Sequence, residues 1–208
     1  NAVDKSGQGN TGYLTNFTST TTVAGKIGQA LEFDGVDDEV DAGDIDTIDN
    51  ATTLSVCAWV YHDSVSTDDL IVGNGDATAG FLFHRDETGV TSGRTDMYRV
   101  IVADSADVDQ AVVETGTDTA LPNVWTHVCF TFEANITNGL HVYINSIEDS
   151  NSPVDTTGVG AMDAGANSVE IGMFGGSNFP FDGRIDDVRV YDRVLSQDEV
   201  TRLYKLGK

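Results

Sequence analysis

The chain has few basic residues. Lys and Arg together number 11, against 34 Asp and Glu, so the formal net charge is −23. No Lys or Arg occurs between Lys26 and Arg85. Because nucleic acids and anionic membranes attract cationic surfaces, this balance argues against both as partners. It suits divalent cations, a solvated surface adapted to salt, or both.

Long apolar runs are missing as well. No stretch approaches the roughly 20 apolar residues of a membrane-spanning helix, which predicts that the chain does not insert into a bilayer. The first residues, NAVDKSGQGN, lack the basic and apolar regions of a signal peptide. With a start at Asn1 instead of Met, they indicate a mature product or an excised domain. We expect one domain over residues 1–208.

Proline is scarce and glycine is frequent, while Val, Ile, Thr, Phe and Tyr recur in short runs. Such runs, separated by Gly, Asn and Asp, predict many short strands and an all-β antiparallel sandwich. The predicted strands are 30–33, 39–42, 53–61, 70–73, 81–85, 97–102, 111–115, 125–133, 140–144, 169–173 and 185–191. Longer connections, where recognition usually lies, are predicted at 15–29, 86–96, 104–110 and 146–167.

Alternation assigns faces to two of these strands. In 53–61, Leu54, Val56, Ala58 and Val60 share one face, while Ser55, Cys57, Trp59 and Tyr61 share the other. In 125–133, Val128, Phe130 and Phe132 lie opposite His127, Cys129 and Thr131. Each strand therefore presents one continuous apolar face to a core.

Only the end of the chain is typical of a helix. Ser196 and Glu199 form the capping-box pattern S-x-x-E. Val200, Leu203 and Tyr204 then follow at helical spacing, and Gly207 can close the last turn. We expect a short helix lying on the sandwich by that stripe.

Cysteine is almost absent. Cys57 and Cys129 both lie in strand-like runs, LSVCAWVY and THVCFTFE. Two interpretations stay open: a disulfide bond in a secreted protein, or two small buried apolar residues.

Six segments in order resemble laminin G-like domains of the concanavalin A-like lectin/glucanase superfamily. They are DKSGQGNTGYLTN at 4–16, GKIGQALEFDGVDDEV at 25–40, TLSVCAWVY at 53–61, NVWTHVCFTFE at 123–133, LHVYINS at 140–146 and FDGRIDDVRVYDRVLSQDEVTRLY at 181–204. The resemblance implies a two-sheet jelly roll, used as a carbohydrate- or protein-binding module on secreted and cell-surface proteins. Cys57 and Cys129 stand where such domains more often carry Ser and Ala, which favours the disulfide slightly.

Enzymes share this fold, so residues must decide whether the chain is catalytic. The E-x-D-x-x-E pattern of retaining glucanases does not occur. The Gln-x-His of alginate-lyase-like members is also missing from the sequence. We therefore expect that the chain is not an enzyme. An unfamiliar polysaccharide-degrading site among His84, Asp86, Glu87 and Arg94 is the alternative.

Aspartates cluster near both ends of the chain and predict a calcium site. Calcium prefers oxygen ligands, and the turn holding Asp34, Asp37 and Asp38 supplies several. The resemblance implies that a structural calcium joins the first and last strands, so Asp186 or Asp187 is expected to complete the shell. The competing interpretation has Asp34 and Asp37 bonding their own backbone, with Asp186 and Asp187 paired to arginines.

The expected glycan contacts are in and beside loops. The segment MFGGSNFPF combines glycines with the aromatic and amide groups of Phe174, Asn178 and Phe179. Tyr98 and a rim Asp76 are further candidates. Trp59 is expected to pack, although it could serve as an aromatic platform for a sugar.

Together these patterns predict a non-catalytic, lectin-like extracellular or cell-surface module. Its expected partners are a glycan or glycosylated protein and other domains of a larger chain, with structural calcium as its cofactor. Besides the enzyme, a structural spacer in an adhesin or envelope protein remains an alternative.

Overall fold

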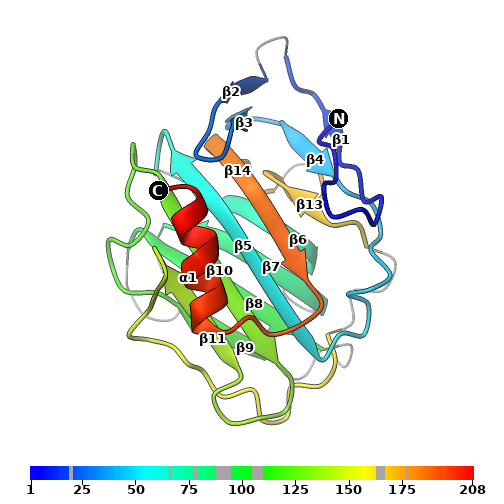
Figure 1. Ribbon diagram of the computed structural model, residues 1–208, viewed down its shortest axis with the longest axis vertical. Coiled ribbons are helices and arrows are strands. Elements are labelled where there is room, and N and C mark those ends of the chain that lie inside the picture. The colour runs from blue at the N-terminus through cyan, green and yellow to red at the C-terminus, as the bar shows by residue number, and fades with distance from the viewer. Residues whose placement is uncertain are drawn as a thin grey trace.

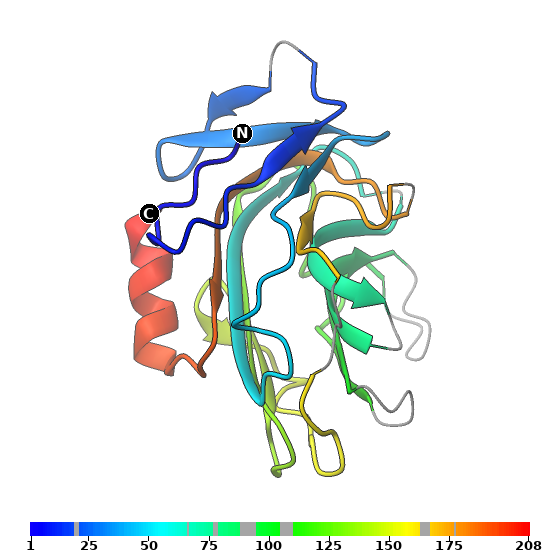
Figure 2. The same ribbon diagram turned by 90° about the vertical axis from the view of Figure 1, so that its right-hand side faces the viewer.

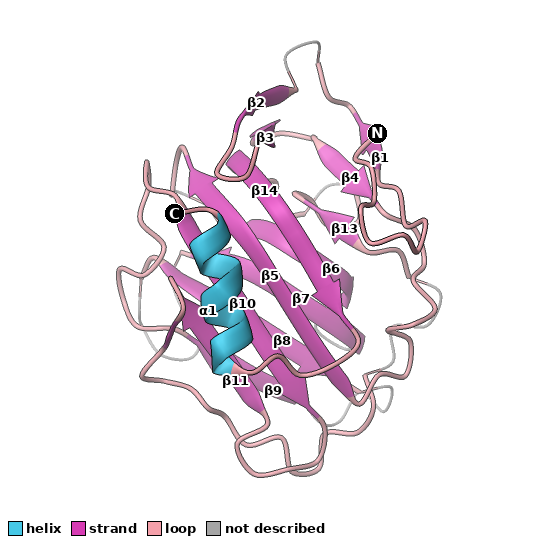
Figure 3. Ribbon diagram, in the orientation of Figure 1, coloured by secondary structure: helices cyan, strands magenta, loops and turns pink. Residues whose placement is uncertain are grey.

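The computed structural model consists of two antiparallel sheets of seven strands packed face to face, with one helix on the outside (Figures 1 and 3). It describes residues 1–208 except 19–20, 66, 77–78, 88–94, 105–109, 163–166 and 177. Within this part of the chain, no helix is long and apolar enough to cross a lipid bilayer. The two-layer arrangement confirms the predicted fold class.

We name each sheet after a central strand. The β7 sheet has the strand order β1 (Tyr13–Thr15), β4 (Glu39–Asp41), β13 (Glu170–Ile171), β6 (Asp69–Asp76), β7 (Ala79–Asp86), β8 (Met97–Ala103) and β9 (Gln110–Glu114). The β5 sheet has the order β12 (Ile147–Glu148), β11 (Leu140–Ile144), β10 (Thr126–Glu133), β5 (Thr53–His62), β14 (Asp182–Tyr191), β3 (Gln29–Asp34) and β2 (Thr22–Ala24).

The core lies between the sheets and follows the predicted alternation. Leu54, Val56, Ala58 and Val60 of β5 are all 0% exposed and belong to the main apolar cluster, as do alternate residues of β10. Phe81 and Phe83 of the β7 sheet face them from the other layer: the Phe83 and Phe130 ring centroids lie 5.3 Å apart. Alternation thus identified the buried face of both strands correctly.

Every predicted strand range overlaps a strand of the structure, but three short strands were not predicted. They are β1, β2 and β12, with two or three residues each. β2 and β12 lie in segments predicted as long connections. All three are the outermost strands of their sheets, so a single neighbour and few alternating residues define them. Short edge strands of this kind leave little periodic signal in a sequence.

The helix α1 (Gln197–Leu206) covers the outer face of the β5 sheet, as Figure 2 shows from the side. Ser196 and Glu199 form both bonds of the capping box, and Gly207 follows the last turn, as predicted. Buried Val200 packs on Cys57, Cys129 and Tyr143, which come from three adjacent strands. The apolar stripe of the helix therefore finds its partner on this sheet.

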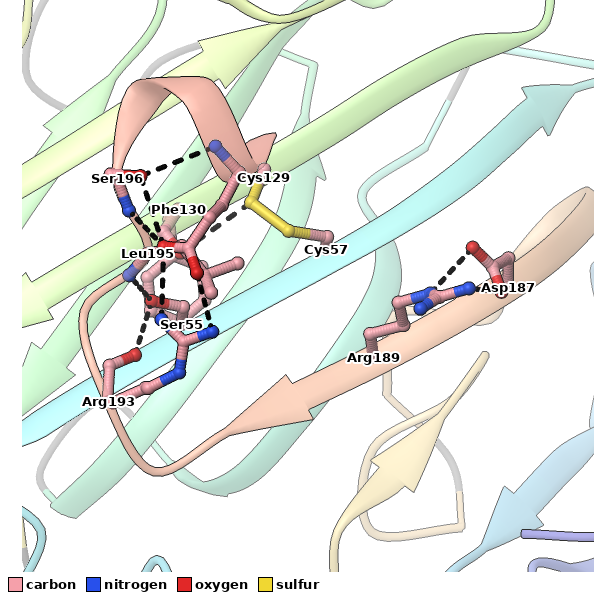
Figure 4. The surroundings of a disulfide bond; sticks show 10 residues. Ser55, Cys57, Cys129, Phe130, Asp187, Arg189, Arg193, Leu195 and Ser196 are labelled. Atoms are coloured by element: carbon pink, nitrogen blue, oxygen red, sulfur yellow. Dashed lines mark hydrogen bonds and ion pairs between the residues drawn. A yellow bond between two sulfur atoms is a disulfide. The ribbon is translucent and has the colours of Figure 1, made fainter. Parts of the chain in front are cut away.

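Cys57 and Cys129 form a disulfide bond under this helix (Figure 4). They lie directly opposite each other on the paired strands β5 and β10. Leu195 donates its backbone N–H to Ser55 Oγ at 3.0 Å and so anchors the segment that enters the helix. The sequence left two interpretations of these cysteines open, and the structure agrees with the disulfide bond.

Trp59 also lies under α1 and is 2% exposed. Its ring stacks on Tyr204 with centroids 5.5 Å apart, and a Cβ atom at Gly207 would come within 2.6 Å of it. The packing interpretation of Trp59 is confirmed, because this ring has no free face for a sugar.

A buried charged network fastens the segment after β5 to the β7 sheet. Asp69 lies 3.2 Å from His62 Nδ1 and 3.8 Å from the Arg85 guanidinium, and all three side chains are at most 1% exposed. Arg85 also pairs with Asp96 at 2.8 Å and donates to backbone carbonyls of the segment. Removing one partner of such a network would leave an uncompensated buried charge.

Candidate functional site

Carboxylates gather in a pocket of about 250 Å³ where β3 ends and β14 begins. Its lining residues are Phe17, Thr18, Thr21, Glu32, Phe33, Asp34, Asp38, Asp63, Asp182. Five of these nine are acidic. We call it the acidic pocket.

The turn after β3 brings three of the predicted metal ligands together. Carboxylate oxygens of Asp34, Asp37 and Asp38 lie within 4.8 Å of one another. The turn depends on Gly35, whose φ of 72° is unfavourable for other residues. Asp34 Oδ1 accepts from the N–H groups of Val36 and Asp37 at 2.9 and 3.4 Å, which is the backbone capping of the competing interpretation. Backbone capping and metal binding are compatible, because each carboxylate has a second oxygen.

Asp38 is the most notable member of this turn. The residue is 6% exposed, and its Oδ2 accepts from the Asp34 N–H at 2.9 Å. Its Oδ1 is buried and has no hydrogen-bond partner in the described part of the structure. Burial and the charge of Asp34 raise the pKa of Asp38. A carboxylate in this position would be stabilised by a cation.

The prediction that Asp186 completes the metal site was wrong. Asp182, not Asp186, lies opposite Asp34 in the pairing of β14 with β3. Four residues separate Asp186 from that position, which is roughly 13 Å along a strand. Asp186 Oδ2 instead accepts from the Ile27 N–H at 2.7 Å. The structure therefore does not bring Asp186 to the turn.

Asp187 is also directed elsewhere. It forms a two-pronged ion pair with Arg189, at 2.8 and 2.9 Å, at an irregularity between Asp186 and Arg189 (Figure 4). This pair matches the competing interpretation. Arg184, in contrast, pairs with Glu32 and Asp63.

Asp182 is the residue that sequence reasoning missed. Its Cβ lies 2.9 Å from where a Cβ of Gly35 would stand, so its side chain borders the predicted turn. Burial and the neighbouring carboxylates, Asp63 first among them, raise its pKa. The sequence shows an aspartate in FDG at 181–183, but which segment lies beside it depends on the register between β3 and β14.

The outer face of the β7 sheet forms a second candidate site. Apolar Leu70, Leu82 and Ile101 lie at its centre, and Phe174 and Phe179 pack on them while staying partly exposed. The predicted loop thus reaches the sheet: the Leu70 N–H donates to the Phe179 carbonyl at 2.8 Å. We call this the β7 face.

His84 and Arg99 are the polar centre of the β7 face. His84 Nδ1 lies 3.1 Å from the Arg85 carbonyl and must donate to it, which leaves Nε2 as an acceptor. That Nε2 is buried without a hydrogen-bond partner among the described residues, and His84 is 4% exposed. Burial lowers the pKa of His84, so the ring is neutral near pH 7. The ring of Phe179 covers it with centroids 5.5 Å apart.

Acidic groups surround this centre. Arg99 lies 3.4 Å from Asp86 and 3.8 Å from Glu114, so its charge is compensated. Further along the same face, burial and Glu170 raise the pKa of Glu39 to about 7. A face with this surplus of carboxylates disfavours anionic ligands.

The remaining predicted contacts have different outcomes. Asn178 is exposed, and its backbone pairs with Phe174 in a small hairpin. The prediction that Tyr98 contacts a glycan at the surface was wrong. Tyr98 is 0% exposed, and its hydroxyl lies 3.4 Å from His62 Nε2 in the core. The side chain of Asp76 lies outside the described residues. So does Arg94 of the alternative catalytic site, while the Glu87 N–H donates to Asp68.

A profile of the concanavalin A-like lectin/glucanases superfamily, of laminin G type, matches residues 34–201. The chain therefore belongs to the laminin G-like family of this superfamily, which confirms the resemblance. No curated protein matches the chain.

Solved structures share the fold at low sequence identity. Domain 4 of AbnA, an extracellular GH43 arabinanase from Geobacillus stearothermophilus solved in complex with arabinotriose, is 22% identical with a TM-score of 0.67. That match covers 100% of this chain and 93% of the domain. The binding domain of Paraclostridial Mosquitocidal Protein 1 is 16% identical with a TM-score of 0.72, over 94% of this chain and 48% of that one. The chain thus spans about half of the toxin domain.

Proposed function

We propose that this chain is a non-catalytic carbohydrate-binding module whose glycan contacts lie on the β7 face. The observation that carries the proposal is the buried, unpartnered Nε2 of His84 beside the partly exposed ring of Phe179. The fold shared with an arabinanase domain solved with arabinotriose supports it. We further propose a secreted or cell-surface location, which the disulfide supports because such bonds persist in oxidising compartments.

The chemistry of the β7 face suits sugars. A neutral imidazole nitrogen accepts a hydrogen bond from a hydroxyl group, and a guanidinium such as that of Arg99 donates to one. The ring of Phe179 offers an apolar surface for the C–H side of a sugar ring. Leaving His84 Nε2 buried and unmatched costs free energy, and a sugar hydroxyl that reaches it when the covering Phe179 ring moves aside would remove that cost.

Titration with a panel of glycans tests this site. His84→Phe keeps a ring of similar size but removes the acceptor, and we expect affinity to fall about tenfold. Phe179→Ala is expected to weaken binding similarly. Ile147→Ala is the matched control, because Ile147 is exposed on the edge of the other sheet. Wild-type affinity in both site variants would contradict the proposal that the β7 face binds the glycan. If the wild type binds no glycan of the panel, the structural spacer role is favoured.

The absence of catalysis is part of the proposal. Asp86 and Glu114 lie 3.4 and 3.8 Å from the Arg99 guanidinium, so each of these carboxylates has a cationic partner. A general acid must keep its proton until it donates it, and a neighbouring cation works against that. Release of reducing or unsaturated sugars from polysaccharides, lost on Asp86→Asn, would instead establish the enzyme alternative.

We also propose a structural calcium at the turn of Asp34, Asp37 and Asp38, with Asp182 bordering it. The carboxylate oxygens present are the ligands that calcium prefers. The orphaned, buried Oδ1 of Asp38 fits such an ion, which would satisfy it and offset the repulsion among these groups. The ion would connect the end of β3 to the start of β14.

Thermal unfolding with and without chelator tests the calcium. A ligand present at 100 times its Kd stabilises the folded state by about 2.7 kcal/mol. We expect calcium to raise Tm in the wild type and Asp38→Asn to abolish the shift. Asp187→Asn, which breaks only the pair with Arg189, should retain it. An unchanged Tm in the wild type would leave backbone capping as the function of the turn.

A further inference from the structure

Side chains from three adjacent strands, and from the residue just before a fourth, form a row across the outer face of the β5 sheet. Arg184 of β14 lies opposite both Tyr61 of β5 and Glu32 of β3 in the strand pairing. Trp125 immediately precedes Thr126, which pairs with Val60, and so stands beside Tyr61. We call Trp125, Tyr61, Arg184 and Glu32 the aromatic row.

The members of the aromatic row touch one another. The ring centroids of Trp125 and Tyr61 lie 5.6 Å apart, and the Arg184 guanidinium carbon lies 4.8 Å above the Tyr61 ring. Arg184 is held in place by Glu32 at 3.1 Å and Asp63 at 3.8 Å. The Tyr61 hydroxyl lies 3.4 Å from Asn123 Oδ1. The row is therefore an ordered surface.

The row differs from the rest of this sheet face in its exposure. Trp59, two residues before Tyr61 on the same face, is 2% exposed because the end of α1 covers it. Tyr61 and Trp125 lie beyond the end of the helix and are only partly buried. The Arg184 side chain is 28% exposed. Large aromatic rings left partly open on a rigid sheet are anchors that recognition sites use.

One end of the row opens into the acidic pocket. Glu32 and Asp63, which hold Arg184, also line that pocket of about 250 Å³. Ionised carboxylates only accept hydrogen bonds, so the pocket matches a ligand rich in hydroxyl donors. Glu32 and Asp63 outnumber the one guanidinium beside them, so this part of the surface stays negative even with the proposed calcium on the turn, and it disfavours carboxylated or sulfated chains.

We propose that the aromatic row and the acidic pocket form a second glycan site, specific for an uncharged polysaccharide. Sugar rings stack on Trp125 and Tyr61, and hydroxyls of the chain donate to Glu32 and Asp63. This site rests on the proposed carbohydrate-binding function but lies on the opposite sheet from the β7 face. A module with both sites would hold a polysaccharide at two separate surfaces.

The test combines affinity with fluorescence, using arabinan and galactan as uncharged chains and polygalacturonate as the anionic one. Trp59 and Trp125 are the two tryptophans of the chain. We expect an uncharged chain to change the emission of the wild type. Trp125→Ala should weaken binding roughly tenfold and remove the change. Trp125→Phe should retain most of the affinity while also losing the signal.

The outcomes separate this site from the general function. If Phe179→Ala abolishes binding and Trp125→Ala leaves it within a factor of about two, the second site is wrong and the carbohydrate-binding function stands. If the wild type binds no polysaccharide, both fail. Tighter binding of polygalacturonate than of the uncharged chains would overturn the inferred specificity. Unchanged Tm values in the Trp125 variants check that folding is intact.

Discussion

The outer faces of the two sheets have opposite characters. On the β5 sheet, α1 covers Trp59, the disulfide and Tyr143, which leaves these groups at most 5% exposed. The β7 face has His84, Arg99 and their acidic neighbours, bordered by two partly exposed Phe rings. The chain thus covers one face with its own helix and leaves the other without one. Buried polar atoms with no hydrogen-bond partner among the described residues occur on both faces: His84 Nε2 on the β7 face, and Trp59 Nε1 and His127 Nδ1 under the helix.

The disulfide should make the largest contribution on the covered face. Replacing both cysteines by Ala is expected to lower the free energy of unfolding by about 4 kcal/mol, because the bond closes a long loop in the unfolded chain. The bonded residues are 72 apart in sequence. Urea unfolding measures this change. Equal midpoints for the wild type and the double variant would show that the helix contact alone holds this face.

His127 should make the covered face sensitive to acid. Burial and then the charge of Arg189 lower its pKa to about 4, from an ordinary value of 6.5. Its ring lies 5.2 Å from Trp59 and 6.0 Å from Tyr204. The unfolded chain therefore takes up this proton at a higher pH than the folded protein does. Stability is complete above pH 6.5 and falls as the pH drops toward 4, by up to about 3 kcal/mol.

Comparison of the wild type with His127→Phe isolates this contribution. We expect the variant to show a flatter dependence of unfolding free energy on pH between 4 and 6.5, since contributions from the carboxylates cancel in the difference. Parallel pH profiles would mean that His127 accepts its proton without cost in the folded protein.

The cap of α1 should have the smallest effect. Ser196→Ala removes the hydroxyl that accepts from the Glu199 N–H and is expected to cost about 1 kcal/mol. Ser196→Asp retains an acceptor and serves as the matched control. If Tm falls equally in both variants, the capping hydrogen bond is not what holds the helix start.

Local patterns predicted much of the fold. Apolar alternation in β5 and β10 identified the buried face, and S-x-x-E located the start of the only helix described. The same alternation could have corrected Tyr98, because it is in phase with buried Val100 and Val102 on β8.

The candidate sites were less predictable, because they depend on which strands become neighbours. The turn of Asp34, Asp37 and Asp38 is local and was found. Its partner Asp182 depends on the register of β14 against β3, about 150 residues away along the chain, a separation matched by the Arg184–Glu32 pair at 152 residues. A shift of register changes every pairing on that strand.

The sequence by itself determined the strands, their buried faces, the capped helix and the acidic turn, because each arises from side chains a few residues apart. Tertiary structure alone decided that the cysteines meet and that Trp125, Tyr61, Arg184 and Glu32 align. Those outcomes depend on the order of strands in two sheets. Pairing between distant segments is set by the packing of the whole core, which no local pattern encodes.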